Sequence, residues 1–167
     1  IKNYEKSNTI KTREGKIMET MQGKKNIVLI GMPGAGKSTV GVVLAKRLGY
    51  RFLDSDLVIQ EQTKKLLHEL ITEHGVDGFL KIEEDINAGL DCEQAVIATG
   101  GSVIYGEKAM EHLREIGCVV YLKLSYKEIE DRLGDLTARG VALKNGQTLK
   151  DLYNERCPLY EKYAHIV

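Results

Sequence analysis

Short apolar runs alternate with amphipathic segments along most of this chain. Four runs have the length and β-branched content of buried strands, and they span residues 26–30, 50–53, 94–98 and 118–122. Apolar residues between and after these runs recur at helical spacing. This spacing predicts one helix that ends at Gly49 and others over 57–74, 79–90, 106–116, 125–133 and 148–163.

A complete phosphate-binding loop follows the first predicted strand. Residues 31–38 read Gly-Met-Pro-Gly-Ala-Gly-Lys-Ser and open a helix, which is the context that a G-x-x-x-x-G-K-S loop requires. Backbone N–H groups of such a loop form an anion nest, the lysine reaches the β/γ-phosphates, and the serine hydroxyl binds Mg²⁺. We therefore expect ATP to be bound by Gly34, Ala35, Gly36, Lys37, Ser38 and Thr39, with Lys37 also catalytic and Ser38 also a metal ligand.

Alternation of strands and helices predicts a parallel sheet with helices on both faces. With the phosphate-binding loop, this predicts an α/β fold of the P-loop NTPase type, a three-layer α/β/α arrangement with a mostly parallel five-stranded sheet. Residues 165–167 are expected to begin the fifth strand. We expect residues 24–167 to form one kinase domain, in which the glycine-bearing stretch 134–147 is a mobile loop.

The N-terminal segment, residues 1–23, differs from the rest. It is rich in Lys, Glu, Thr and Asn and has neither apolar periodicity nor the apolar centre of a signal peptide. It is expected to be a disordered tail, or upstream sequence translated ahead of a start at Met18 or Met21. A transit peptide is the weaker alternative, because Glu5, Glu14 and Glu19 are uncommon in such peptides.

Composition narrows the class of partner. The chain has 167 residues, with 24 basic and 24 acidic residues and a formal net charge of zero, so nothing indicates attraction to nucleic acid or to a membrane. Its three cysteines are widely spaced, and we expect free thiols in a reducing compartment. We expect a cytoplasmic monomer that binds neither nucleic acid nor membrane and whose partner is a small molecule.

Two polar segments follow predicted strands and are candidates for the acceptor side. Asp54 and Asp56 could hold Mg²⁺ or accept a proton from an acceptor hydroxyl, although Asp-Ser-Asp is also a common helix cap. Gly100 and Gly101 would let the backbone approach a ligand closely, or form a plain turn. Ligands of parallel α/β sheets bind at the carboxyl ends of strands, so these segments and the loop are expected to share one site.

Two arginines could supply positive charge to that site. Arg139 lies in the glycine-bearing stretch, and P-loop enzymes often use an arginine on a moving segment to offset charge on the transferring phosphoryl group. Arg156 lies in the last predicted helix and could reach an anionic acceptor. The alternatives are a solvated loop arginine and a surface ion pair, respectively.

From about Asn26 to Val167 the chain resembles the shikimate kinases, small P-loop kinases of aromatic amino-acid biosynthesis. The resemblance rests on an ordered set of motifs, which are Gly31 to Gly41, Asp54-x-Asp56, Phe79 with Glu83, Gly100-Gly101 and Glu155-Arg156-x-Pro158-Leu159-Tyr160. It implies a five-stranded parallel sheet and Mg²⁺-dependent transfer of phosphate from ATP to the 3-hydroxyl of shikimate.

The resemblance also implies roles for single residues. Asp54 would lie near the metal, and Asp56 would hold and polarise the acceptor hydroxyl. Gly100, Gly101 and Arg156 would bind shikimate, the arginine through the acceptor carboxylate. Arg132 would stack near adenine, and Arg139 would be the lid arginine that closes over the phosphates.

Three positions depart from the family pattern. Leu80 stands where the family has an arginine that clamps the shikimate carboxylate, Ser102 replaces a third glycine, and Gly140 replaces a lid proline. The ATP-binding motifs are unchanged. The alternatives to a shikimate kinase are therefore a kinase for another small hydroxylated metabolite and a nucleotide-binding module without acceptor turnover.

Overall fold

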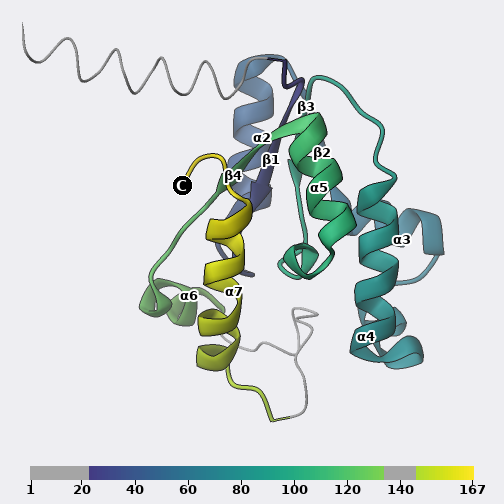
Figure 1. Cartoon of the computed structure of the whole chain (residues 1–167), viewed down its shortest axis with the longest axis vertical. Coiled ribbons are helices and arrows are strands. Elements are labelled where there is room, and N and C mark those ends of the chain that lie inside the picture. The colour runs from purple at the N-terminus through teal and green to yellow at the C-terminus, as the bar shows by residue number, and fades with distance from the viewer. Residues whose placement is uncertain (1–22, 134–145) are drawn as a thin grey trace, which may run out of the picture.

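The computed structural model describes residues 23–133 and 146–167. Its helices and strands follow one another in the predicted alternation (Figure 1). They are β1 (Asn26–Ile30), α2 (Lys37–Leu48), β2 (Arg51–Asp54), α3 (Ser55–Thr63), α4 (Leu67–Ala88), β3 (Ala95–Ala98), the 3₁₀ turn η1 (Val103–Tyr105), α5 (Glu107–Ile116), β4 (Gly117–Tyr121), α6 (Tyr126–Leu133) and α7 (Leu149–Tyr163).

The strands form one parallel sheet in the order β2-β3-β1-β4. The predicted count of five strands is too high, because the described chain forms four strands and one isolated parallel bridge between Val120 and Ile166. This bridge lies on the outer edge of β4, where Tyr121 N donates to Ile166 O at 2.8 Å. The C-terminal residues therefore begin to extend the sheet where the fifth strand is expected, but do not form a full strand.

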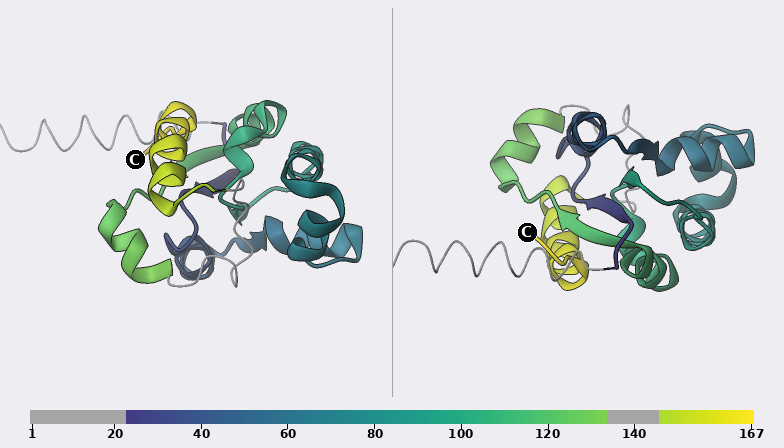
Figure 2. Two further views of the ribbon diagram at one scale, coloured as in Figure 1. Left: turned by 90° about the horizontal axis from the view of Figure 1, so that it is seen from below. Right: turned by 90° about the horizontal axis from the view of Figure 1, so that it is seen from above.

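Side chains that alternate along β1 enter two different cores. Ile27 and Leu29 pack with Ala45 of α2 on one face of the sheet, while Val28 and Ile30 pack beneath α5 and α7 on the other. Figure 2 shows the resulting three layers, with the sheet between α2 on one side and α5 and α7 on the other. The three-layer α/β/α prediction is confirmed.

The predicted helix over 57–74 is wrong in its bounds. The structure begins α3 at Ser55, ends it at Thr63 and starts α4 at Leu67. Lys64 breaks the helix because it takes a left-handed conformation, with φ at 57°. Of the predicted interruption over 75–78, only Gly75 is non-helical, with φ at 68° and ψ at 178°, while Gly78 continues α4.

Helix α7 begins at the predicted cap. Thr148 Oγ1 accepts from Asp151 N at 3.1 Å, and Asp151 Oδ2 accepts from Thr148 N at 3.0 Å. Within residues 23–133 and 146–167, no helix is long and apolar enough to cross a membrane. The predicted tail over 1–23, apart from Gly23, and the loop over 134–147, apart from its last two residues, lie outside the described residues.

Candidate active site

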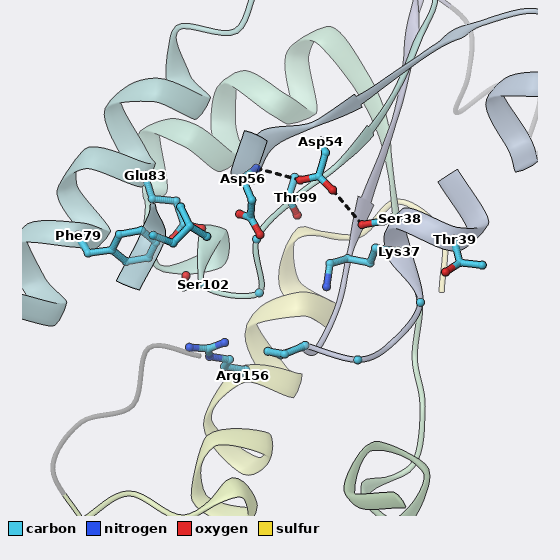
Figure 3. Close-up of a pocket in the computed structure, with 16 residues that line it drawn as sticks. Lys37, Ser38, Thr39, Asp54, Asp56, Phe79, Glu83, Thr99, Ser102 and Arg156 are labelled. Carbon is cyan, nitrogen blue, oxygen red and sulfur yellow. Dashed lines mark hydrogen bonds between the residues drawn. The ribbon is translucent and has the colours of Figure 1, made fainter. Parts of the chain in front are cut away.

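One pocket lies at the carboxyl ends of β1, β2 and β3, where the sequence predicts a shared site. It brings together the phosphate-binding loop, both predicted aspartates, both predicted glycines and the arginine of α7 (Figure 3). Its lining residues are Pro33, Gly34, Gly36, Lys37, Ser38, Thr39, Asp54, Asp56, Leu67, Phe79, Glu83, Thr99, Gly100, Gly101, Ser102 and Arg156.

The loop backbone depends on glycine where it turns into α2. Gly34 and Gly36 have φ values of 77° and 93°, which side-chain-bearing residues rarely adopt, and Gly36 is the N-cap of α2. Lys37 is buried inside the loop, where its Nζ donates to Gly31 O at 2.8 Å and to Met32 O at 3.0 Å. Burial lowers the pKa of Lys37 to about 8, and the Asp56 carboxylate opposes that shift.

Asp54 is both a helix cap and a neighbour of the loop serine. Its Oδ1 accepts from Asp56 N at 3.0 Å, which caps α3, and its Oδ2 accepts from Ser38 Oγ at 3.0 Å. Asp54 therefore caps α3 and also lines the pocket, so the helix-cap alternative does not remove it from the predicted site. Because the helix starts at Ser55, Asp56 lies in its first turn and not on a continued strand.

The Ser38 and Asp54 oxygens fit a magnesium site. Neighbouring ligands of an octahedral Mg²⁺ lie about 3 Å apart when each is about 2.1 Å from the metal, and Ser38 Oγ and Asp54 Oδ2 are 3.0 Å apart. Among the described residues, no group of three or more His, Cys, Asp or Glu could hold a metal ion.

Gly100 brings two carboxylates close to bare backbone. A Cβ atom at this position would lie 2.4 Å from Glu83 Oε1 and 2.8 Å from Asp56 Oδ1, so no side chain fits there without a shift. Ser55 Oγ accepts from Gly100 N at 3.3 Å and ties the turn to α3. Burial and the neighbouring Asp54 raise the pKa of Asp56 to about 6.

Glu83 is a pocket residue to which the sequence assigns no role beyond membership of the Phe79–Glu83 motif. It is 1% exposed, and among the described residues its carboxylate oxygens have no hydrogen-bond partner of good geometry. Burial raises its pKa to about 7, while the nearby Ser102 hydroxyl favours the ionised form. Its i, i+4 spacing with Phe79 and Asn87 on the buried face of α4 is the signal that could have identified it.

Arg156 faces the pocket from α7, across from Asp56 (Figure 3). It is 2% exposed, and a Cβ atom at Gly101 would lie 3.1 Å from its Nη1. The neighbouring Tyr160 donates to Gly101 O at 2.5 Å, which fixes the glycine turn to the same helix. The arginine is therefore a buried pocket residue and not a surface side chain.

The other predicted ATP-binding residues lie around the loop. Ala35 is buried, Thr39 is exposed at the pocket wall, and Arg132 Nη1 lies 4.0 Å from the position of a Cβ atom on Gly36. Arg139 falls outside the described residues.

Of the three departures from the family pattern, Ser102 lines the pocket and Gly140 lies outside the described residues. Leu80 packs with the apolar cluster of α3 and α4 and does not line the pocket. Its neighbour Lys81 is exposed and pairs with Glu84 and Asp85, so it does not replace a pocket cation. Among the described lining residues, the cationic side chains are Lys37 and Arg156.

Comparison with known proteins agrees with the motifs. The family model for shikimate kinase matches residues 33–167. A shikimate kinase of Clostridium botulinum (strain Eklund 17B / Type B) is 39% identical over 145 residues, covering 85% of this chain and 86% of the relative. A shikimate kinase of Thermodesulfovibrio yellowstonii is 38% identical over 141 residues, covering 83% of this chain and 82% of the relative.

A solved structure has the same fold at similar identity. The shikimate kinase of Acinetobacter baumannii in complex with shikimate superposes with a TM-score of 0.78 at 34% identity, covering 89% of this chain and 84% of that one. The phosphate-binding loop, the paired aspartates and the arginine of α7 lie in one pocket of the fold that these proteins share. The chain belongs to the shikimate kinase family.

Proposed function

We propose that this protein transfers the γ-phosphoryl group of ATP to the 3-hydroxyl of shikimate. The observation that carries the proposal is the convergence of Lys37, Asp56 and Arg156 on one pocket from three separate elements. A phosphate-binding cation, a hydroxyl acceptor group and a carboxylate-binding cation are the parts that such a transfer needs. The resemblance to a structure in complex with shikimate supports this acceptor.

ATP would bind over the loop at the N-terminus of α2. Lys37 would exchange the two loop carbonyls for phosphate oxygens, with its positive charge on the β/γ-phosphates. Ser38 and Asp54 would hold Mg²⁺, directly or through water, and when bound this ion neutralises charge on the phosphate oxygens. Arg132, whose Nη1 lies near Gly36, would stack near adenine, and Arg139 is proposed as the lid arginine on sequence grounds alone.

Shikimate would bind between Gly100, Gly101 and α7. Its carboxylate would pair with Arg156, and its reacting hydroxyl would donate to Asp56. The bare backbone at Gly100 lets the Asp56 and Glu83 carboxylates lie against the turn, because a side chain there would meet both. This arrangement aligns the hydroxyl for direct in-line attack, so that positioning and charge stabilisation supply most of the catalysis.

The test is ATP turnover by the purified chain with Mg²⁺, measured with and without shikimate. Strong stimulation by shikimate is expected, and Lys37→Ala should cut it by about three orders of magnitude or more while near-UV circular dichroism stays unchanged. Binding of ATP without stimulation by any hydroxylated acid or sugar would instead indicate a nucleotide-binding module.

A kinase for another small hydroxylated metabolite is the second candidate. Leu80 favours this candidate, because an uncharged residue there leaves Arg156 as the cation, among the described lining residues, that would bind an acceptor carboxylate. If shikimate is the acceptor, Leu80→Arg should lower the KM for shikimate by about tenfold through a second contact with its carboxylate, and Leu80→Met, unbranched and uncharged, should not. An unchanged or raised KM in Leu80→Arg would argue for a different acceptor.

A further inference from the structure

Arg156 contacts Tyr105, a residue that the family motifs do not include. Its Nε donates to the Tyr105 hydroxyl at 3.2 Å, and its Cζ lies 5.3 Å from the centre of the Tyr105 ring. Tyr105 belongs to η1, directly after the glycine turn of the pocket, but does not line the pocket itself. The tyrosine therefore contacts the arginine from outside the set of residues that line the pocket.

The Tyr105 hydroxyl has only one proton, and its partners fix where that proton goes. The hydroxyl donates to Glu155 Oε1 at 2.5 Å, which leaves an oxygen lone pair to accept from Arg156 Nε. Glu155 Oε2 in turn accepts from Gln147 Nε2 at 2.8 Å. Arg156 thus donates to the tyrosine hydroxyl, and the hydroxyl donates to Glu155. The hydroxyl connects the buried cation to a carboxylate.

This connection restricts how the guanidinium can turn. Arginine has a planar fork of donors, so fixing Nε fixes the plane in which the terminal nitrogens lie. Nη1 then lies beside Gly101, at the pocket wall. A side chain whose rotamer is fixed before the ligand arrives loses less entropy on binding.

We propose that Tyr105 is a positioning residue for the acceptor, one that orients Arg156 through its Nε and connects it to Glu155. The inference rests on the proposed function, because it takes the acceptor carboxylate as the partner of Arg156. It adds a positioning role for a residue that does not line the pocket.

Steady-state kinetics of Tyr105→Phe test the proposal, since this change removes the hydroxyl and keeps the ring. The KM for shikimate should rise about tenfold, while the KM for ATP and kcat stay within about twofold. Tyr126→Phe is the matched control, because Tyr126 makes the same kind of bond to Glu130, at 2.8 Å, on the outside of α6. An unchanged KM for shikimate in Tyr105→Phe would overturn the proposal.

A double-mutant cycle separates positioning from a general structural effect. Lysine has no counterpart of Nε–H, so Tyr105→Phe should add less than about twofold to the KM for shikimate in an Arg156→Lys background. Effects that multiply would show that Tyr105 acts by another route, and would overturn the proposal.

Proton NMR supplies a measurement that needs no acceptor. In ¹⁵N-labelled protein, the Nε–Hε signal assigned to Arg156 by its loss in Arg156→Lys should shift and exchange faster with solvent in Tyr105→Phe, and stay unchanged in Tyr126→Phe. If the wild type does not phosphorylate shikimate, the proposed function fails, and this signal alone decides whether Tyr105 orients the arginine. No change in Tyr105→Phe would refute it.

Discussion

Lys37, Asp56 and Glu83 all ionise nearer to neutral pH than usual, because burial opposes the charged form of each. Their pKa values lie at about 8, about 6 and about 7, respectively. Groups with pKa values displaced toward neutrality cluster at functional sites. Here they share one pocket, so catalysis and stability should both depend on pH between 6 and 8.

The acid limb of the kcat/KM profile for shikimate should report Asp56. Only the ionised carboxylate can accept the acceptor's hydroxyl proton, so kcat/KM should fall about tenfold per pH unit below about 6, the pKa of this side chain. Asp56→Asn should abolish the limb along with most activity. Steady-state rates from pH 5 to 8 measure this acid limb. If the limb disappears in Glu83→Gln, it reports Glu83 and not Asp56.

Glu83→Gln should stabilise the protein at pH 8. The folded-state pKa of Glu83 is raised from 4.5 to about 7. The protonated side chain therefore contributes stability below pH 4.5, and this contribution falls as pH rises and is gone above about 7. The full shift corresponds to about 3 kcal/mol, and the neutral glutamine avoids that cost. Urea unfolding should show a gain of about 1–3 kcal/mol at pH 8 and none below pH 4.5.

Glu61→Gln is the matched control, since Glu61 is exposed on α3. It should change the free energy of unfolding by less than about 0.5 kcal/mol at either pH. If Glu83→Gln has the same free energy of unfolding as the wild type at both pH 4.5 and pH 8, the buried carboxylate is stabilised more than its burial indicates.

Among the elements, α7 supplies the pocket residue Arg156 together with Tyr160 and Glu155. Local signals predict this helix well, since Thr148 and Asp151 form a capping box that depends only on near neighbours. The break between α3 and α4 follows from no such local signal. Lys64 takes a left-handed conformation that its residue type does not favour, so tertiary packing decides it.

Thr148→Ala should weaken the start of α7. Loss of the cap should cost about 1 kcal/mol, which lowers Tm by about 2–4 °C in a chain of this size. Thr72→Ala is the control, because Thr72 is exposed inside α4 and its hydroxyl bonds only to His68 O of the preceding turn. Thermal unfolding followed by circular dichroism compares the two, and equal Tm values would contradict the capping role.

The molecule as a whole could be predicted in outline from its alternating pattern. Buried parallel strands are continuous apolar runs, so β1, β3 and β4 were identifiable, and the rule that ligands bind at strand ends placed Asp54, Asp56, Gly100 and Gly101 together. Glu83 was harder to assign, because it reaches the pocket from the middle of a helix. The strand count was too high because Ile166 makes only a single bridge.

Removal of residues 165–167 should destabilise the β4 edge of the sheet. It would leave Tyr121 N and Val119 O without the partners supplied by residues 165 and 166. Water can replace these bonds at an exposed edge, so the expected loss is modest, about 1–2 kcal/mol in urea unfolding. A chain ending at Ala164 with unchanged stability would show that the bridge contributes nothing.

The three buried ionisable groups also make ligand binding a proton-transfer event with the buffer. Phosphate oxygens placed on Lys37 would stabilise its ammonium, and an acceptor carboxylate would make ionisation of Asp56 and Glu83 harder, so each ligand should draw protons from solution. The heat of binding would then include the buffer's own heat of ionisation. Calorimetric titrations at one pH in Tris and in phosphate should therefore give different apparent enthalpies. This difference, divided by the difference between the two buffers' heats of ionisation, gives the number of protons taken up.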